Sequence, residues 1–183
     1  MTSTPEAHRT HEQRTRVLEG AFRRLTGLLY DTSVTRARME AEVAPHLAEG
    51  VTFKDPWQTG VGKDAYRTGM AGFHAMFRFD FDVRQLNVTL APDGRTGRAM
   101  VDGVMHLKQL GPIFTYPLRT ILTFAFAVAD PDSPEHFLVT EHEEMWSLGD
   151  MIEAVPLLGR IYSQRFRPAF AKGFLIASRV ASR

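Results

Sequence analysis

The stretch Phe137-Leu138-Val139-Thr140-Glu141-His142-Glu143-Glu144-Met145-Trp146-Ser147-Leu148 reads as an apolar β-strand that holds four consecutive ionisable residues. Successive side chains of a strand point to opposite faces, so any register directs two residues of the run Glu141 to Glu144 inward. A buried charge without a partner is costly, and where one is kept its surroundings usually tune it. The stretch therefore predicts a cavity with a polar wall inside a β-containing domain.

Length and composition indicate one well-packed domain and exclude several classes of function. The chain has 183 residues, of which 44% are hydrophobic, and its net charge of +1 argues against nucleic-acid binding. It has no cysteine, so disulfides, thiolate metal sites and catalytic thiols are excluded. No apolar run reaches the roughly 18 residues of a membrane span, and the start lacks a signal-peptide core. We therefore expect a soluble, cytoplasmic protein without nucleic-acid or membrane partners.

The periodicity of apolar residues places helices first and strands after them. A helix beginning near Glu12 is followed by a second, capped at Asp31-Thr32-Ser33 and including Leu47. A short strand, Val51 to Asp55, and a turn-rich loop lead to a third helix. After Phe79 the pattern alternates, which predicts antiparallel strands. These strands cover approximately Asp80 to Ala91, Arg95 to Gln109, Phe114 to Ala129 and His136 to Leu148, with turns that include Gly111-Pro112, and a final helical segment is broken near Pro156, Gly159 and Pro168.

Charge is segregated in the last third of the chain. Asp130 to Glu153 holds eight acids and no Lys or Arg, whereas Arg160 to Arg183 holds six bases and no acid. The basic segment could lie across the acidic one, in the same or a neighbouring subunit, or both could simply be solvated. Phe166, Phe170 and Phe174, at four-residue spacing, predict a core-facing stripe rather than a membrane-binding face. We expect a disordered leader (1–11), one domain (12–165) and a basic C-terminal helical arm (166–183).

Two short motifs resemble the nuclear transport factor 2-like superfamily. Val51-Thr52-Phe53-Lys54-Asp55-Pro56, followed by Gly60 and a helix, is similar to its "F-x-D-P … G" pattern. His142-x-Glu144-x-Trp146 resembles the "H-x-D-x-W" ending of uncharacterised members, with Glu in place of Asp. The superfamily includes ketosteroid isomerases, SnoaL-like polyketide cyclases, scytalone dehydratase and binding proteins. The resemblance implies an α+β cone, in which N-terminal helices pack on the concave face of a curved antiparallel sheet, a pocket between them, and a homodimer.

Alternation alone leaves open which pair of the final strand faces this pocket. His142 and Glu144 share one face with Leu138, Thr140 and Trp146, and Glu141 and Glu143 share the other with Val139 and Met145. The resemblance favours His142 with Glu144. Burial among aromatic residues raises a carboxyl pKa toward neutrality, so Glu144 would be the general base. His142 would orient it or donate to a developing oxyanion.

Other side chains complete the predicted site, and their alternative roles stay open. The substrate-binding candidates are Asp55, Trp57, Asp102, His106, Arg119 and Trp146. In the alternative interpretation, the charges of the final strand face solvent or pair with Arg119 and the basic arm as structural contacts. We expect no metal, because adjacent strand residues point apart and no His-Glu-x-x-His motif is present.

Two classes of function fit these features. The first is a cofactor-independent isomerase, cyclase or dehydratase that acts by acid–base catalysis on a small, apolar organic molecule. The second is a non-catalytic module that binds a ligand or assembles with a protein partner. Neither class requires a cofactor, and the same fold hosts both.

Overall fold

The computed structural model describes residues 5–108, 115–155 and 157–181. The chain divides into two compact units, Met1–Trp146 and Ser147–Arg183. The predicted turn at Gly111-Pro112, the predicted break at Pro156 and the first four residues of the predicted leader lie outside the described residues.

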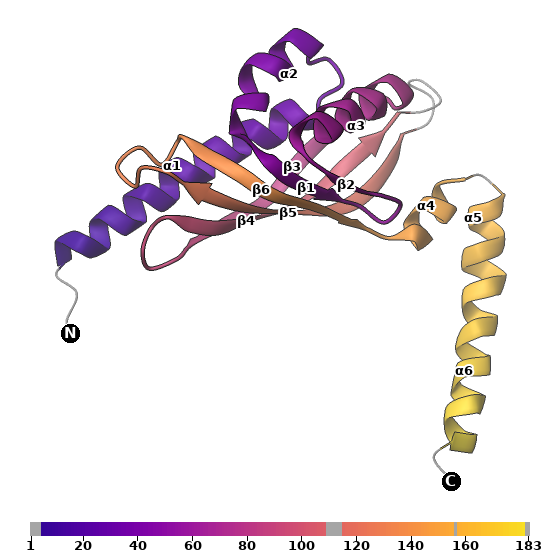
Figure 1. Ribbon diagram of the computed structural model, residues 1–183. Helices are drawn as coiled ribbons and strands as arrows, with labels where there is room; N and C mark the ends of the chain where they lie inside the picture. The colour runs from indigo at the N-terminus through magenta and orange to yellow at the C-terminus, as the bar shows by residue number, and fades with distance from the viewer. Residues whose placement is uncertain (1–4, 109–114, 156, 182–183) are drawn as a thin grey trace. The chain divides into compact units, whose positions relative to one another are not determined.

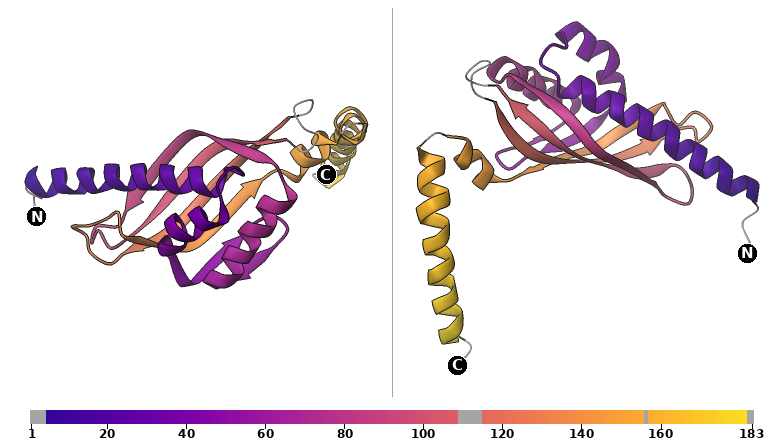
Figure 2. Two further views of the ribbon diagram at one scale, coloured as in Figure 1. Left: turned by 90° about the horizontal axis from the view of Figure 1, so that it is seen from above. Right: turned by 180° about the vertical axis from the view of Figure 1, so that it is seen from behind.

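The first unit is a curved sheet with helices on one face (Figure 1). Its elements are α1 (Pro5–Leu29), α2 (Arg36–Glu42), a 3-10 turn (Ala44–His46), β1 (Leu47–Lys54), β2 (Thr59–Val61), α3 (Lys63–Met76), β3 (Phe79–Leu90), β4 (Thr96–Leu107), β5 (Tyr116–Val128) and β6 (Phe137–Trp146). The strands form one six-stranded sheet in the order β2-β1-β6-β5-β4-β3. Seen from above, α1, α2 and α3 all lie over the same face (Figure 2). The predicted α+β class, a curved sheet carrying N-terminal helices, is confirmed; β1 and β6 pair in parallel, whereas only antiparallel pairs were expected.

The helical region differs from the sequence prediction at three points. Helix α1 begins at Pro5 rather than near Glu12, consistent with the preference of proline for the first helical position. Thr35 caps α2 by accepting from the Arg38 amide at 3.3 Å, so the cap lies beyond Asp31-Thr32-Ser33. Pro45 then prevents the helix from continuing, and Leu47 is buried in β1 instead.

A β-bulge in β6 decides which side chains point inward. The pairing of β6 with β5 runs from Glu141 opposite Ala125 directly to Val139 opposite Phe126, so Thr140 is the extra residue. The bulge changes the parity of the strand: Phe137 and Val139 are buried before it, and His142 and Glu144 after it. Leu138, which strict alternation places beside His142, is 41% exposed.

Aromatic packing fills one end of the space between α1 and the sheet. Phe22 of α1 lies 4.4 Å from the ring of Phe137, 5.0 Å from Phe126 and 5.5 Å from Phe124. Four buried aromatic rings in contact form a rigid apolar plug. Polar side chains of the inner face therefore gather at the other end, near the C-terminus of α1.

The second unit is helical. It contains α4 (Leu148–Ala154), α5 (Leu158–Ile161), a π-helical turn (Tyr162–Phe166) and α6 (Arg167–Ala181). The sequence predicted a break at Pro168, but α6 continues through this residue. The π-helical turn just before α6 already alters the hydrogen-bond spacing, so the helix tolerates the proline. The prediction of a core-facing aromatic stripe is wrong: Phe166, Phe170 and Phe174 are all more than half exposed.

Candidate functional site

Glu144 and His142 are the ionisable residues that β6 carries to the inside of the first unit. His142 is fully buried and Glu144 is 5% exposed. Glu141 and Glu143 point to the opposite face, where Glu143 lies 3.4 Å from the Nζ atom of Lys54. The structure thus places inward the pair that the motif resemblance favours.

The hydroxyl of Tyr30 joins the two inward residues. It donates a short hydrogen bond to Oε1 of Glu144 and lies 3.1 Å from Nε2 of His142. On the other side of the imidazole, the hydroxyl of Tyr66 lies 2.7 Å from Nδ1. A fourth contact, 3.4 Å long, runs from the indole nitrogen of Trp146 to Oε2 of Glu144. The buried carboxyl and imidazole are therefore linked through Tyr30.

When Glu144 is ionised, the donors and acceptors available in these groups fix which group donates in each hydrogen bond. Tyr30 has one hydroxyl proton and gives it to Glu144, so Nε2 of His142 must donate to the Tyr30 oxygen. In a neutral imidazole the other nitrogen is then an acceptor, and it receives the hydroxyl proton of Tyr66. Tyr30, His142 and Glu144 thus each have a hydrogen-bond partner, as buried polar groups in low-dielectric interiors require.

Burial shifts the pKa values of all four groups. Desolvation raises the pKa of Glu144 to about 7, although the hydrogen bond from Tyr30 opposes the shift. Desolvation lowers the pKa of His142 to about 3, so the imidazole is neutral at physiological pH. The pKa values of Tyr30 and Tyr66 lie well above the usual range because of burial and the nearby Glu144 charge. Of these four buried groups, Glu144 is the one whose pKa lies near 7.

Glu144 opens into a cavity of about 320 Å³, here called the acid cavity. It lies between α3, the β1–β2 connection and the end of β6, and its walls are mainly aromatic and thioether side chains. They include Phe53, Trp57, Met70, Phe73, Phe77 and Trp146. A mostly apolar concave site with a few polar groups and a carboxyl of shifted pKa is the usual form of a small-molecule site.

Asp55, Trp57 and Trp146, three of the predicted substrate-binding residues, line the acid cavity. Asp55 accepts backbone hydrogen bonds from Trp57 at 2.7 Å and Gln58 at 2.9 Å, which fix the turn between β1 and β2. The two indole rings meet edge to face, 4.8 Å apart, and Trp57 is 58% exposed. Asp55 also contributes to the raised pKa of Glu144 by like-charge repulsion.

Asp102, His106 and Arg119, the other three candidates, are not brought to the acid cavity. Asp102 and His106 alternate on β4 with the buried Val101 and Met105, so they point to the opposite face of the sheet. Arg119 projects from the same outer face of β5 and holds Asp102 at 3.0 Å. Burial of the apolar face of each strand decides this placement, and the candidate site is therefore built without these residues.

Tyr30 is the site residue that the sequence did not reveal. It follows the last residue of α1, and its ring packs against Phe81, 5.2 Å away. Gly103 of β4 makes room for Phe81, since a Cβ atom there would lie 2.4 Å from the Phe81 ring. Tyr66 is a buried residue of α3, and nothing in the helical pattern of the sequence indicated a partner for its hydroxyl.

Two searches of the described residues bear on metals and membranes. No three His, Asp or Glu side chains in this part of the chain come close enough together to form a metal site. Among the same residues, none of the helices combines the length and apolarity needed to cross a bilayer.

Comparisons with known proteins identify the fold of the chain. No family model matches the sequence, and no curated protein matches it. Among solved structures, an NTF2-like protein with a cystatin-like fold from Novosphingobium aromaticivorans superposes with a TM-score of 0.57 at 15% identity, over 81% of this chain and 92% of that one. A scytalone dehydratase-like protein from the same organism gives a TM-score of 0.56 at 13% identity, over 73% and 83%.

The nuclear transport factor 2 of Cryptosporidium parvum gives a TM-score of 0.52 at 9% identity, over 80% of this chain and 99% of that one. Identities this low show a shared architecture and leave the reaction open. The chain has the α+β cone fold of the nuclear transport factor 2-like proteins.

Proposed function

We propose that the acid cavity is the active site of a cofactor-independent enzyme that moves protons on a small, largely apolar organic molecule. The observation that carries the proposal is Glu144: a buried carboxyl with a pKa of about 7, at the wall of a cavity lined by aromatic side chains. A general base works best when its pKa lies near the working pH, so this carboxyl suits both removal and return of a proton.

Isomerisations, cyclisations and dehydrations of carbonyl compounds that pass through an enolate share one step, removal of a proton from a carbon beside the carbonyl. In this proposal Glu144 takes that proton, because its carboxyl opens into the cavity and its pKa lies near 7. Tyr30 holds Oε1 in place, leaving Oε2 toward the Trp146 side. His142 does not line the cavity and reaches Glu144 through Tyr30, so it is a positioning residue here.

Two further features support the proposal. Asp55, Trp57 and Trp146 line the same cavity as Glu144, and the two indole rings offer apolar surface against which a flat molecule can pack. The scytalone dehydratase-like protein with the same fold carries the name of a dehydratase, a member of the proposed reaction class.

Hydrogen–deuterium exchange of a small apolar ketone tests the proposal without knowledge of the natural substrate. The protein in D₂O should accelerate exchange at the carbons beside the carbonyl of 2-tetralone, followed by NMR, and Glu144→Gln should remove the acceleration. Glu143→Gln is the matched control, because the neighbouring carboxylate points to the other face. Equal exchange rates in wild type and Glu144→Gln would contradict the assignment.

A second candidate function is assembly through the C-terminal arm. The exposed aromatic residues of the arm, Phe166, Phe170 and Phe174, offer an apolar surface, and six bases accompany them from Arg160 onward. In this proposal the arm docks on a second copy of the chain, whose Asp130–Glu153 segment supplies opposite charge. Deletion of the residues after Arg167 should then lower the apparent mass in size-exclusion chromatography while exchange activity persists. An unchanged elution volume would dismiss the arm as the assembly surface.

A further inference from the structure

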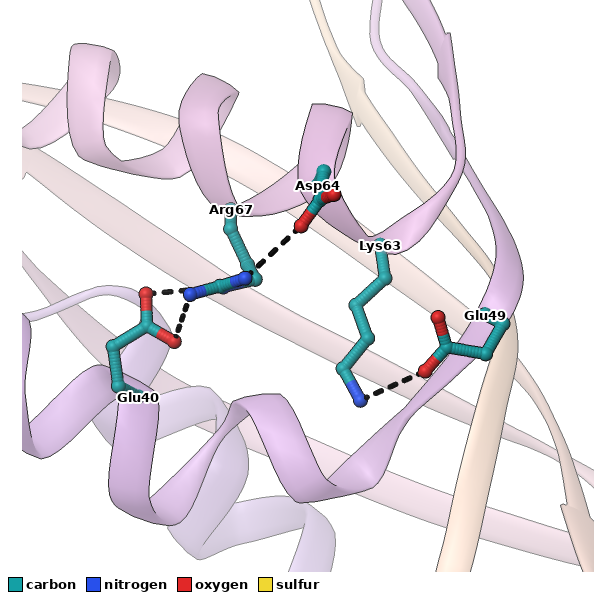
Figure 3. A network of polar contacts seen from close by, with 5 residues as sticks. All are labelled: Glu40, Glu49, Lys63, Asp64 and Arg67. Atoms are coloured by element: carbon teal, nitrogen blue, oxygen red, sulfur yellow. Dashed lines mark hydrogen bonds and ion pairs between the residues drawn. The ribbon is translucent and has the colours of Figure 1, made fainter.

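A second cavity, of about 270 Å³, lies between α2 and α3, and we call it the helix cavity. Its floor is apolar and includes Val43, Leu47 and Met70, all buried. Arg67 of α3 spans its rim and binds Glu40 of α2 through two contacts, at 3.0 and 2.5 Å (Figure 3). The Arg67–Glu40 pair neutralises its own charge, and the apolar floor suits an uncharged occupant; Arg36, which also lines the cavity, is exposed to solvent.

One layer of side chains separates the helix cavity from the acid cavity. Tyr66 and Met70 line both cavities, one helical turn apart on α3. The hydrogen bond to His142 at 2.7 Å and an edge-to-face contact with Phe53 at 5.7 Å hold the Tyr66 ring. Met70 has an unbranched thioether side chain that changes rotamer easily. Met70 is therefore the movable part of the wall.

The size of each cavity favours their joint use. Pockets for drug-sized molecules span about 300–1,000 Å³. At about 320 and 270 Å³, each cavity alone is near or below the lower limit, whereas the two together fall well inside the range. Helix α2, which covers the helix cavity, has no buried residue of its own, and ion pairs from Glu40 and Glu42 tie it to its neighbours. Ion pairs that solvent partly reaches contribute little stability, so a ligand can displace them.

We propose that the helix cavity is a second subsite of the same pocket, which takes the alkyl tail of a substrate whose polar head lies against Glu144, with Met70 moving aside between them. The proposal rests on the proposed function and adds to it a substrate class: cyclic or aromatic ketones, or their enols, that carry a linear alkyl chain. Such a molecule presents one oxygen to the carboxyl and buries its chain beneath α2.

Calorimetric titration with 4-alkylphenols, from 4-ethylphenol to 4-hexylphenol, tests the subsite, because a phenol resembles an enol and is uncharged at pH 7. In the wild type each added methylene should tighten binding several-fold, as expected for burial of apolar surface. Ala71→Phe fills the helix cavity from an exposed position that does not line the acid cavity. This substitution should leave the affinity for 4-ethylphenol unchanged and abolish the increase in affinity with chain length.

Met70→Ala removes the movable part of the wall and should strengthen 4-hexylphenol binding relative to 4-ethylphenol. A thermal melt checks that Met70→Ala folds. If Met70→Ala does not fold, the titrations of Ala71→Phe still decide the test. Undiminished chain-length dependence in Ala71→Phe overturns the subsite. Binding of 4-ethylphenol with no gain for longer chains in the wild type overturns the subsite alone, whereas absence of binding by every phenol overturns the proposed function with it.

Discussion

Tyr30 and Glu144, 114 residues apart in the chain, share a short hydrogen bond in the interior of the cone. When Glu144 is ionised, donation runs from Tyr66 through His142 and Tyr30 to the carboxylate. When Glu144 is protonated on Oε1 it can donate to the Tyr30 oxygen, and Tyr30 can then donate to Nε2 in the imidazole tautomer that carries its proton on Nδ1. The carboxyl therefore has Tyr30 as a partner in both of its charge states, which suits a group that must alternate between them.

The rate of proton exchange should rise with pH and level off above a midpoint near 7, because only the ionised form of Glu144 is a base. His142, with its pKa lowered to about 3, should add no second ionisation between pH 5 and 9. The pH profile of kcat/KM for 2-tetralone exchange measures this. A midpoint near 4.5, the ordinary value for Glu, would show that the carboxyl is solvated in solution.

Stability should also depend on Glu144, with a defined sign. Its pKa is about 7 in the folded state and about 4.5 when exposed, so the folded state binds the proton more tightly. The contribution of protonated Glu144 to the free energy of unfolding is fully present below pH 4.5 and is lost as pH rises through 7. This contribution amounts to about 3 kcal/mol. Glu144→Gln should remove this dependence and exceed the wild type in stability at pH 8. Urea unfolding of both proteins at pH 5 and pH 8 measures it, and parallel pH trends would contradict the buried carboxyl.

Tyr30→Phe should move the midpoint of the activity profile to higher pH. Burial raises the pKa of Glu144 and the hydrogen bond from Tyr30 lowers it, so loss of this bond should raise the pKa further. The variant also leaves Nε2 of His142 without a partner, which costs about 1–3 kcal/mol of stability. Tyr66→Phe is the matched control, since it removes the bond to Nδ1 and leaves the Tyr30–Glu144 bond in place. Equal midpoint shifts in both variants would argue against the specific role of Tyr30.

His142→Phe should reduce kcat without abolishing turnover, unlike Glu144→Gln. The phenyl ring can keep the stacked packing against Phe124, 4.3 Å away, but it provides neither nitrogen to the two tyrosines. Because His142 acts through Tyr30, KM should change little. His142→Gln, whose amide can donate and accept, should recover part of kcat. Complete loss of activity in both variants would instead indicate direct participation of the imidazole.

The four long strands could be predicted to within two residues at each end, because alternation and turn residues are local signals. The orientation of β6 could not. Two interpretations of its faces followed from strict alternation, and the bulge at Thr140 made both incomplete by burying Phe137 and Val139 together with His142 and Glu144. A bulge arises from the packing of neighbouring strands, which no single strand sequence reveals.

The partners of the site were equally hidden. Tyr30 and Tyr66 lie on separate helices, and their hydroxyls meet His142 only when those helices pack on the sheet. Asp102 and Arg119 show the converse: both were predicted to bind substrate, yet the apolar residues that alternate with them occupy the inner face of the sheet. Residue type alone does not tell a cavity acid from an outward one.

Substitutions on the outer face provide the last test of this geometry. Asp102→Asn and Arg119→Gln each break an ion pair of 3.0 Å that lies across the sheet from Glu144. Arg119 is 67% exposed and solvent screens the pair, so stability should change little. Exchange of 2-tetralone and binding of 4-ethylphenol should match the wild type in both variants. A loss of exchange comparable to that of Glu144→Gln would mean that the outer face of the sheet, and not the acid cavity, holds the reacting molecule.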